Sequence, residues 1–327
     1  MSFLTKISQF FSKNVLNQNI GIAFQQGGIS LCSIPEIQVN NEVDETQIKS
    51  KAAKVIFDQQ SANSTDFVKI IQTLHSNNDL EGSATLVLSE AQSQVVQVDK
   101  PTVPESEINS ALKWQIKDLV NISPSNMLLD YYDAPTLAGG KEKINVVCTA
   151  LDELKKLVMV TEQGLLKVKS ITTQEFAFAN LLPLQKEANL LVCQQPNEEI
   201  VLIIVKQKQI FFQRRLRGFT QIGNKTAEEL SSSIIDEISL EIQRSTDYFE
   251  RQLKQAPIKA IKVLLPIELE NLFVEKLTEN TTAPVSLLAL PRPYHQHREF
   301  AASIGACLAN STAYAPDLDE GDNHYGS

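Results

Sequence analysis

The chain has 327 residues, which predicts about two domains, and its 43% hydrophobic and 21% charged residues are ordinary for a globular protein. Thirty Lys and Arg stand against 39 Asp and Glu, and this net charge of −9 argues against a general nucleic-acid-binding protein, which needs a basic face. No apolar run approaches the ~18 residues of a membrane span. These features together predict a soluble, cytoplasmic protein in two parts.

The cysteines and histidines argue against a metal site. The four cysteines lie far apart with no CxxC pair, and we expect reduced, buried or nearly buried thiols: Cys32, Cys148, Cys193 and Cys307. The four histidines form no HExxH motif and no cluster with cysteine. His295 and His297 are one residue apart, but two ligands alone make a poor metal site.

Residues 1–17 begin with an apolar stripe at helical spacing, formed by Phe3, Leu4, Ile7, Phe10 and Phe11. The segment lacks the continuous apolar region and cleavage site of a secretory signal. An amphipathic helix is therefore expected. It either docks on a partner or a membrane surface, or packs on its own domain.

The first half alternates strands and helices. Residues 19–24 and 29–34 predict a hairpin, because Gly27 and Gly28 lie between two apolar runs. Residues 40–64 are polar and have little period. A helix at 66–74, capped by Asp66 or Thr65, comes next. The later elements are strands at 84–88 and 94–98, a helix from 105 to about 120 after Pro104, strands at 127–132 and 143–149 joined through Gly139 and Gly140, a helix at 151–163 ending at Gly164, a strand at 165–171 and a helix at 173–182.

The second half opens with three strands in a meander, at 189–193, 200–205 and 209–214. A long helix at 226–254 follows, and then a strand at 260–265, a helix at 268–278, a strand at 285–288 and a helix at 299–308. Residues 310–327 are acidic, and we expect them to be disordered. Because both halves open with a hairpin or meander and then alternate, the order predicts an α/β protein with a cleft between two similar halves.

This element order resembles the actin-like ATPase superfamily, and three stretches resemble the PilM family of type IV pilus assembly proteins. They are ALKWQIKDLVNISPSNMLLDYY at 111–132, EIQRSTDYF at 241–249 and FAASIGACL at 300–308. The stretch FFQRRLRGF at 211–219 is similar to PilM-like members of the mannose-sensitive haemagglutinin (MSHA) pilus system, the MshI family. The resemblance implies a ribonuclease H-like fold of two halves, 18–187 and 188–309, with a subdomain inserted at about 91–163.

The resemblance also locates a nucleotide site, but this chain departs from its pattern. The family's first hairpin reads Gly-Ile-Asp-Ile-Gly, and here Gly21 is followed by Ala23 and Gln25 at the Asp and second Gly positions. The second hairpin's Asp-x-Gly falls on Gln194-Gln195-Pro196, and proline has no N–H to offer a phosphate. No glycine follows the strand at 260–265, where an adenosine motif belongs.

These departures remove the anionic partners of Mg²⁺, which takes oxygen ligands. Gly27 and Gly28 can cradle a phosphate, but they also make the hairpin turn by themselves. We therefore expect no catalytic residue and no cofactor, with ATP and Mg²⁺ doubtful. The degenerate site would consist of Gly21, Gln25, Gly27, Gly28 and Gln194.

The resemblance implies a cytoplasmic scaffold that binds the short N-terminus of a PilN-like inner-membrane protein, of the MshJ type, near the inserted subdomain. Trp114, the single tryptophan, and Asp118 are candidates for this contact, although a tryptophan at this spacing also suits the core. Arg214, Arg215 and Arg217 form a basic patch for acidic lipid or an acidic partner, or else pair with carboxylates elsewhere. The alternatives are an ATP-binding or ATP-hydrolysing switch in which Gln25 and Gln194 position water, and a divergent sugar kinase.

Overall fold

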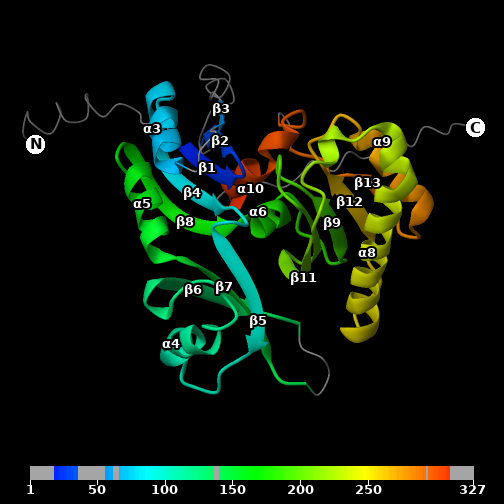
Figure 1. Cartoon of the computed structure of the whole chain (residues 1–327), viewed down its shortest axis with the longest axis horizontal. Helices are drawn as coiled ribbons and strands as arrows, with labels where there is room; N and C mark the ends of the chain where they lie inside the picture. The colour runs from blue at the N-terminus through cyan, green and yellow to red at the C-terminus, as the bar shows by residue number, and fades with distance from the viewer. Residues whose placement is uncertain (1–17, 36–55, 62–65, 136–139, 292–293, 310–327) are drawn as a thin grey trace, which may run out of the picture.

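The computed structural model describes residues 18–35, 56–61, 66–135, 140–291 and 294–309. The expected N-terminal helix and acidic tail, and part of the turn at Gly139, lie outside these residues. Two five-stranded sheets and one smaller sheet form the framework (Figure 1).

The first sheet has the order β3–β2–β1–β4–β8. Its strands are β1 (Gln18–Gln25), β2 (Gly28–Pro35), β3 (Ile56–Ser61), β4 (Glu81–Leu88) and β8 (Leu165–Thr173). The hairpin of β1 and β2 confirms the glycine-turn prediction. β3 pairs antiparallel with β2, while β4 is parallel to β1 and β8 to β4.

The second sheet repeats this plan in the order β11–β10–β9–β12–β13. Its strands are β9 (Asn189–Cys193), β10 (Ile200–Lys206), β11 (Gln209–Leu216), β12 (Ala260–Leu264) and β13 (Val285–Leu287). Three antiparallel strands again precede two parallel ones. The predicted similarity of the halves is therefore confirmed at the level of strand order and direction.

Two short helices, α6 (Gln174–Asn180) and α10 (Ala301–Ala309), lie between the two sheets (Figure 1). Their approach depends on glycine. A Cβ at Gly305 would lie 2.0 Å from the Ala177 carbonyl oxygen of α6, and a Cβ at Gly21 would lie 2.0 Å from the Ser303 oxygen of α10. Gly21 therefore has a packing role on β1, in addition to its position in the hairpin sequence.

All four cysteines are free and buried, as the sequence predicted. Cys307 donates its Sγ proton to the main-chain oxygens of Asn19 and Cys32, each at 3.2 Å. Burial also raises the pKa of the Cys148 thiol.

Helices cover the outer faces of both sheets. α3 (Phe67–Asn77) and α5 (Leu151–Thr161) cover the first, and the Asp66 side chain caps α3 as predicted. The predicted long helix and α9 (Glu270–Asn280) cover the outer face of the second sheet. The long helix is a continuous helical run of four parts: α7 (Ala227–Glu229), η3 (Leu230–Ile234), α8 (Ile235–Asp247) and η4 (Tyr248–Gln252). η3 and η4 are π-helical, whereas short 3₁₀ turns form η1 (Pro124–Asn126), η2 (Ile222–Asn224) and η5 (Arg298–Phe300).

The insert contains an antiparallel sheet, β5 (Ser93–Asp99), β7 (Lys143–Ala150) and β6 (Met127–Asp133), in that order. α4 (Glu105–Gln115) covers one face of it through Ile108 and Leu112. α4 ends at Gln115, whereas the sequence predicted about residue 120. The apolar spacing continues past the helix because Ile116 and Val120 enter the same core from a turn.

The expected boundary of the insert at residue 163 differs from the observed packing. Leu154, Leu157 and Val160 of α5 join the core of the first sheet together with Ile70, Ile71 and Leu74 of α3. α5 thus belongs to the first half, and the insert runs from β5 to β7.

Candidate functional site

The expected nucleotide site lies between the first turns of the two halves, and several side chains at these turns are buried. Gly27 has a φ of 81°, which the hairpin turn requires. Gln25, at the family's second glycine position, is only 3% exposed. Among the residues described, its Oε1 has no hydrogen-bond partner.

Gln194 is committed to its own half. Its Nε2 donates to the main-chain oxygens of Glu198, at 2.7 Å, and Phe219, at 2.9 Å. The side chain therefore braces the turn between β9 and β10, where the family pattern has an aspartate.

The next residue, Gln195, crosses to the first half. Its Nε2 donates to the Phe24 main-chain oxygen and to Gln174 Oε1, both at 3.3 Å. Gln174 in turn donates to Glu198 Oε2 at 3.0 Å. Gln174, Gln195 and Glu198 were not predicted as site residues, and they link β1, α6 and the β9–β10 turn.

Carboxylates and one arginine complete this cluster. Glu175 is buried and pairs with Arg215 of β11, which also lies 3.6 Å from Glu90. Burial raises the pKa of Glu198 to about 7, against the opposing effects of Arg215 and Gln174. Glu175 is thus paired with Arg215, and Glu198 with Gln174.

The position expected for the adenosine motif is also closed by side chains. Glu270 Oε1 accepts a hydrogen bond from the Leu265 N–H at 2.6 Å, directly after β12. Arg298 pairs with the same carboxylate at 2.5 Å. An ion pair therefore holds the segment where the family pattern has glycines.

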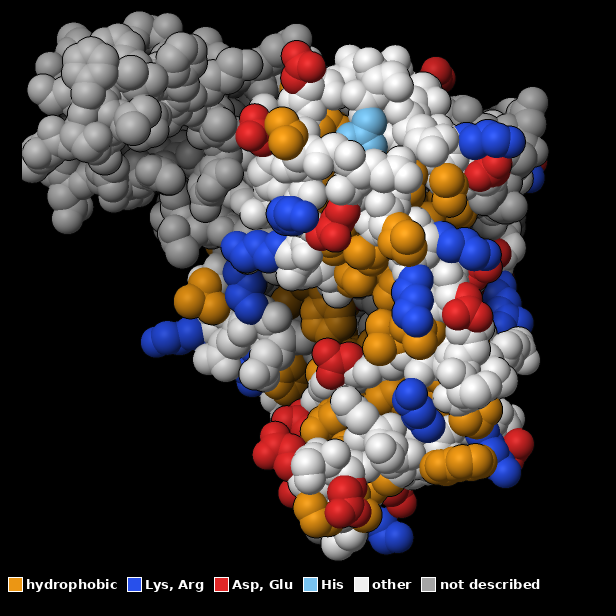
Figure 2. All heavy atoms as spheres, turned by 90° about the vertical axis from the view of Figure 1, so that its left-hand side faces the viewer, with side chains coloured by type: hydrophobic (Ala, Val, Ile, Leu, Met, Phe, Trp, Pro, Cys, Tyr) orange, Lys and Arg blue, Asp and Glu red, His pale blue; other side chains and the backbone are white. Residues whose placement is uncertain are grey.

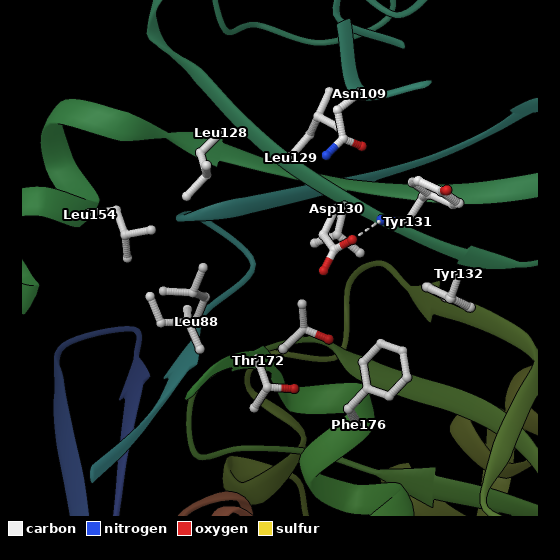
Figure 3. A pocket seen from close by; sticks show the side chains of 13 residues that line it. Leu88, Asn109, Leu128, Leu129, Asp130, Tyr131, Tyr132, Leu154, Thr172 and Phe176 are labelled. Atoms are coloured by element: carbon white, nitrogen blue, oxygen red, sulfur yellow. Dashed lines mark hydrogen bonds between the residues drawn. The ribbon is translucent and has the colours of Figure 1, made fainter. Parts of the chain in front are cut away.

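A groove separates the insert from the first half, with a volume of about 610 Å³. Figure 3 shows Leu128 and Asp130 of β6 facing Leu88, Thr172 and Phe176 across it. In Figure 2, hydrophobic side chains lie recessed between the upper and lower parts of the face that carries α3 and α5.

β6 is the edge strand of the insert's sheet, because β7 lies between it and β5. Within the described part of the chain, one row of its main-chain N–H and C=O groups thus has no neighbouring strand. Leu128, 42% exposed, and Asp130 alternate with buried Leu129. Asp130 Oδ1 accepts only the Tyr131 N–H, at 2.8 Å, among the hydrogen bonds of the described residues. An edge strand with apolar neighbours suits the addition of an extended peptide.

Trp114 and Asp118, the predicted partner contacts, lie on the insert but not in this groove. Trp114 is 67% exposed on α4, with Lys117 Nζ 6.0 Å from its ring centroid. The alternative of a core tryptophan is therefore wrong. Asp118 is exposed in the turn after α4, and neither residue lines the groove.

The basic patch is mostly paired. Arg214 lies 2.6 Å from Glu241 and over the Phe212 ring, and Arg215 pairs with Glu175. Arg217 alone of the three is exposed with no ion pair among the described residues. Pairing with carboxylates, the second interpretation of the sequence, is what the structure shows for Arg214 and Arg215.

His295 and His297 lie in different environments. The His297 ring stacks on Phe57 with centroids 4.0 Å apart, while His295 is exposed. Over the described ranges, no group of three or more His, Cys, Asp or Glu could hold a metal ion. In the same ranges, no helix is long and apolar enough to cross a bilayer.

Comparisons with known proteins give structural matches only: no protein-family model and no curated protein matches the sequence. A PilM–PilN type IV pilus biogenesis complex aligns with a TM-score of 0.60 and 14% identity, over 90% of this chain and 98% of that one. The cytoplasmic domain of EpsL, an inner-membrane component of the type II secretion system of Vibrio cholerae, aligns with a TM-score of 0.45 and 13% identity, over 83% and 85%. A Bacteroides thetaiotaomicron protein with an actin-like ATPase fold aligns with a TM-score of 0.46 and 7% identity, over 87% and 93%. Together with the repeated strand order, the likeness establishes that this chain has the two-half actin-like ATPase fold.

Proposed function

We propose that this protein is a scaffold of a type IV pilus assembly platform and that its groove binds the cytoplasmic N-terminus of a PilN-like inner-membrane protein. The observation that carries the proposal is the open edge of β6 beside the apolar groove. The structural likeness to a PilM–PilN complex supports the same class of partner.

The chemistry of the groove suits a short extended peptide. Main-chain groups at the edge of β6 supply affinity for any peptide main chain, and alternate side chains enter the space beside Leu128 and Phe176. No catalytic group is needed for this role. The fold by itself does not give the function, so the proposal rests on the groove.

We also propose that the cleft between the halves neither hydrolyses ATP nor uses a cofactor. Gln25 and Gln194 replace the expected glycine and aspartate, and Gln195 joins the two hairpins directly. A nucleotide would have to displace the cluster of Gln174, Gln195 and Glu198.

A finer assignment follows from the sequence at 211–219, which is similar to the MshI family. We propose an MSHA-type pilus as the system, an MshJ-type protein as the partner, and attachment to the inner membrane through that partner. The discriminating measurement compares binding of an MshJ-type N-terminal peptide with that of a PilN peptide from another type IV pilus.

The experiment that tests the scaffold role is titration of the purified protein with a synthetic peptide of the PilN-like N-terminus. Leu128→Arg places a charge in the groove, whereas Leu240→Arg alters a leucine of similar exposure on α8. We expect saturable binding by the wild type and by Leu240→Arg, and at least about a tenfold loss in Leu128→Arg. Absence of binding by the wild type, or equal loss in both variants, would overturn the proposal.

A further inference from the structure

The groove has a neighbour past the end of β6. This second space has a volume of about 440 Å³. Tyr132 and Phe176 line both spaces, and their rings pack edge to face with centroids 5.0 Å apart. A segment lying along β6 therefore meets this second space directly after the first.

The second half of the protein forms one wall of this second space. Residues 208–211, at the start of β11, line it opposite Ala134 and Pro135 of the insert. Its lining is partly apolar, with Ile210 and Phe211 from the second half. The second space thus lies between the insert and the second half of the protein.

The turn that forms this wall is held in a strained conformation. Gln207 and Lys208 have φ angles of 53° and 65°, where residues other than glycine or asparagine are uncommon. Lys208 Nζ donates to the main-chain oxygens of Asn180, at 3.2 Å, and Leu182. These bonds attach the β10–β11 turn to the end of α6, so the wall is fixed in place.

Tyr132 lies at the junction of the two spaces. Among the described residues, its Oη is buried and has no hydrogen-bond partner. The part of Tyr132 that an occupant of the two spaces can touch is therefore its ring. Asp130 lies two residues away on the same face of β6.

We infer that the occupant of the groove is one extended segment, which lies along β6 and continues over Tyr132 onto the β10–β11 turn of the second half. This inference rests on the proposed function and extends it. Apolar side chains of the segment fill both spaces and pack on the Tyr132 ring. Binding would therefore connect the insert to the second half.

The length of the segment provides the test. Residues 128–135 span about 25 Å at the rise of an extended chain, so about eight residues are needed to reach both spaces. Peptides of the PilN-like N-terminus, with 12 residues or shortened to five from either end, would be titrated into the full-length protein. We expect the 12-residue peptide to bind about tenfold more tightly than either five-residue peptide.

Two variants assign that gain to the second half and to Tyr132. Gln209→Trp fills the second space from its exposed wall, and Gln252→Trp is the control at an exposed position of η4. We expect the 12-residue peptide to bind Gln209→Trp only as tightly as the better five-residue peptide does. The five-residue peptides should bind this variant and the wild type equally well. Tyr132→Ala, which removes the ring that both spaces share, should weaken the long peptide about fivefold.

The outcomes separate this inference from the function on which it rests. Equal affinities for long and short peptides, or equal effects of the two Trp variants, would overturn the extended occupant. If Leu128→Arg still abolished binding in that case, the scaffold role would stand. Failure of every peptide to bind the wild type would overturn both.

Discussion

Gln195 of the second half donates its Nε2 proton to the main-chain oxygen of Phe24 in the first half, 171 residues away. Phe24 is at the end of β1, in the hairpin that holds phosphate in the actin-like ATPases resembled by this chain. A direct hydrogen bond thus joins the two hairpins. A side chain of the second half is therefore bonded to the main chain of the first half.

Removal of this bond should destabilise the protein. Gln195→Ala leaves the Phe24 oxygen and Gln174 Oε1 buried without the Nε2 donor, so we expect the free energy of unfolding to fall by about 2 kcal/mol. Gln252→Ala, at an exposed position, is the control. Urea denaturation of both variants measures the difference, and equal stability would contradict a structural role for the bond.

The stability of the protein should depend on pH through Glu198. Burial raises the pKa of this carboxyl to about 7 in the folded state, above its ordinary value of 4.5. A raised pKa means that the folded state binds the proton more tightly, so this contribution is fully present below about pH 4.5 and is lost as the pH rises to about 7. Glu198→Gln remains neutral throughout, so its stability relative to the wild type should increase over this range, by up to about 3 kcal/mol at pH 8.

Urea denaturation between pH 4.5 and pH 8 checks this dependence. Glu268→Gln, which removes the same charge from an exposed residue, is the control. A constant difference between Glu198→Gln and the wild type would show that folding does not raise the pKa of Glu198.

The sequence predicted the framework well because local signals and the fold agree. Glycines at 27 and 28 lie between apolar runs, and the hairpin formed there. β3 was missed because it is a short edge strand containing Asp58, Gln59 and Gln60, so no apolar pattern marks it. The early end of α4 was missed because the apolar pattern continues beyond the helix: Ile116 and Val120 of the following turn keep the helical spacing.

The sites were harder to predict because they depend on distant contacts. Glutamines normally occupy the surface, and Gln174 and Gln195 are buried where the two halves meet. The groove likewise requires the insert to lie against the first half. The alternation of Leu128, Asp130 and Tyr132 on a strand was the available signal for the groove. The prediction instead placed the partner contact at Trp114, on another surface of the insert.

The packing of α10 on α6 gives a sharp prediction for Gly305. Gly305→Ala places a Cβ 2.0 Å from the Ala177 main-chain oxygen, so one helix must move. We expect a loss of about 3 kcal/mol in the free energy of unfolding. Gly223→Ala is the control because its Cβ would meet only the Ile267 methyl group, at 3.3 Å. Comparable stability of the two variants would contradict the close helix contact.

The proposed absence of nucleotide binding is tested by calorimetric titration with Mg²⁺-ATP. We expect no saturable heat up to millimolar nucleotide, because buried glutamines occupy the cleft. Binding of the PilN-like peptide to the same sample would show that the protein is functional. Saturable binding in the micromolar range would instead support the nucleotide-gated switch, and Gln25 and Gln194 would be the first residues to replace.

Because Trp114 is the single tryptophan of the chain, its fluorescence can distinguish binding in the groove from binding at the exposed surface of α4. Its exposure on α4 predicts fluorescence that is readily quenched by acrylamide in the free protein. An occupant of the groove lies beside β6 and does not touch Trp114, so saturating peptide should leave the quenching constant unchanged. Trp114→Phe should likewise bind the peptide with wild-type affinity. Protection of Trp114 by the peptide, together with weaker binding by Trp114→Phe, would move the partner's site from the groove to the exposed surface of α4.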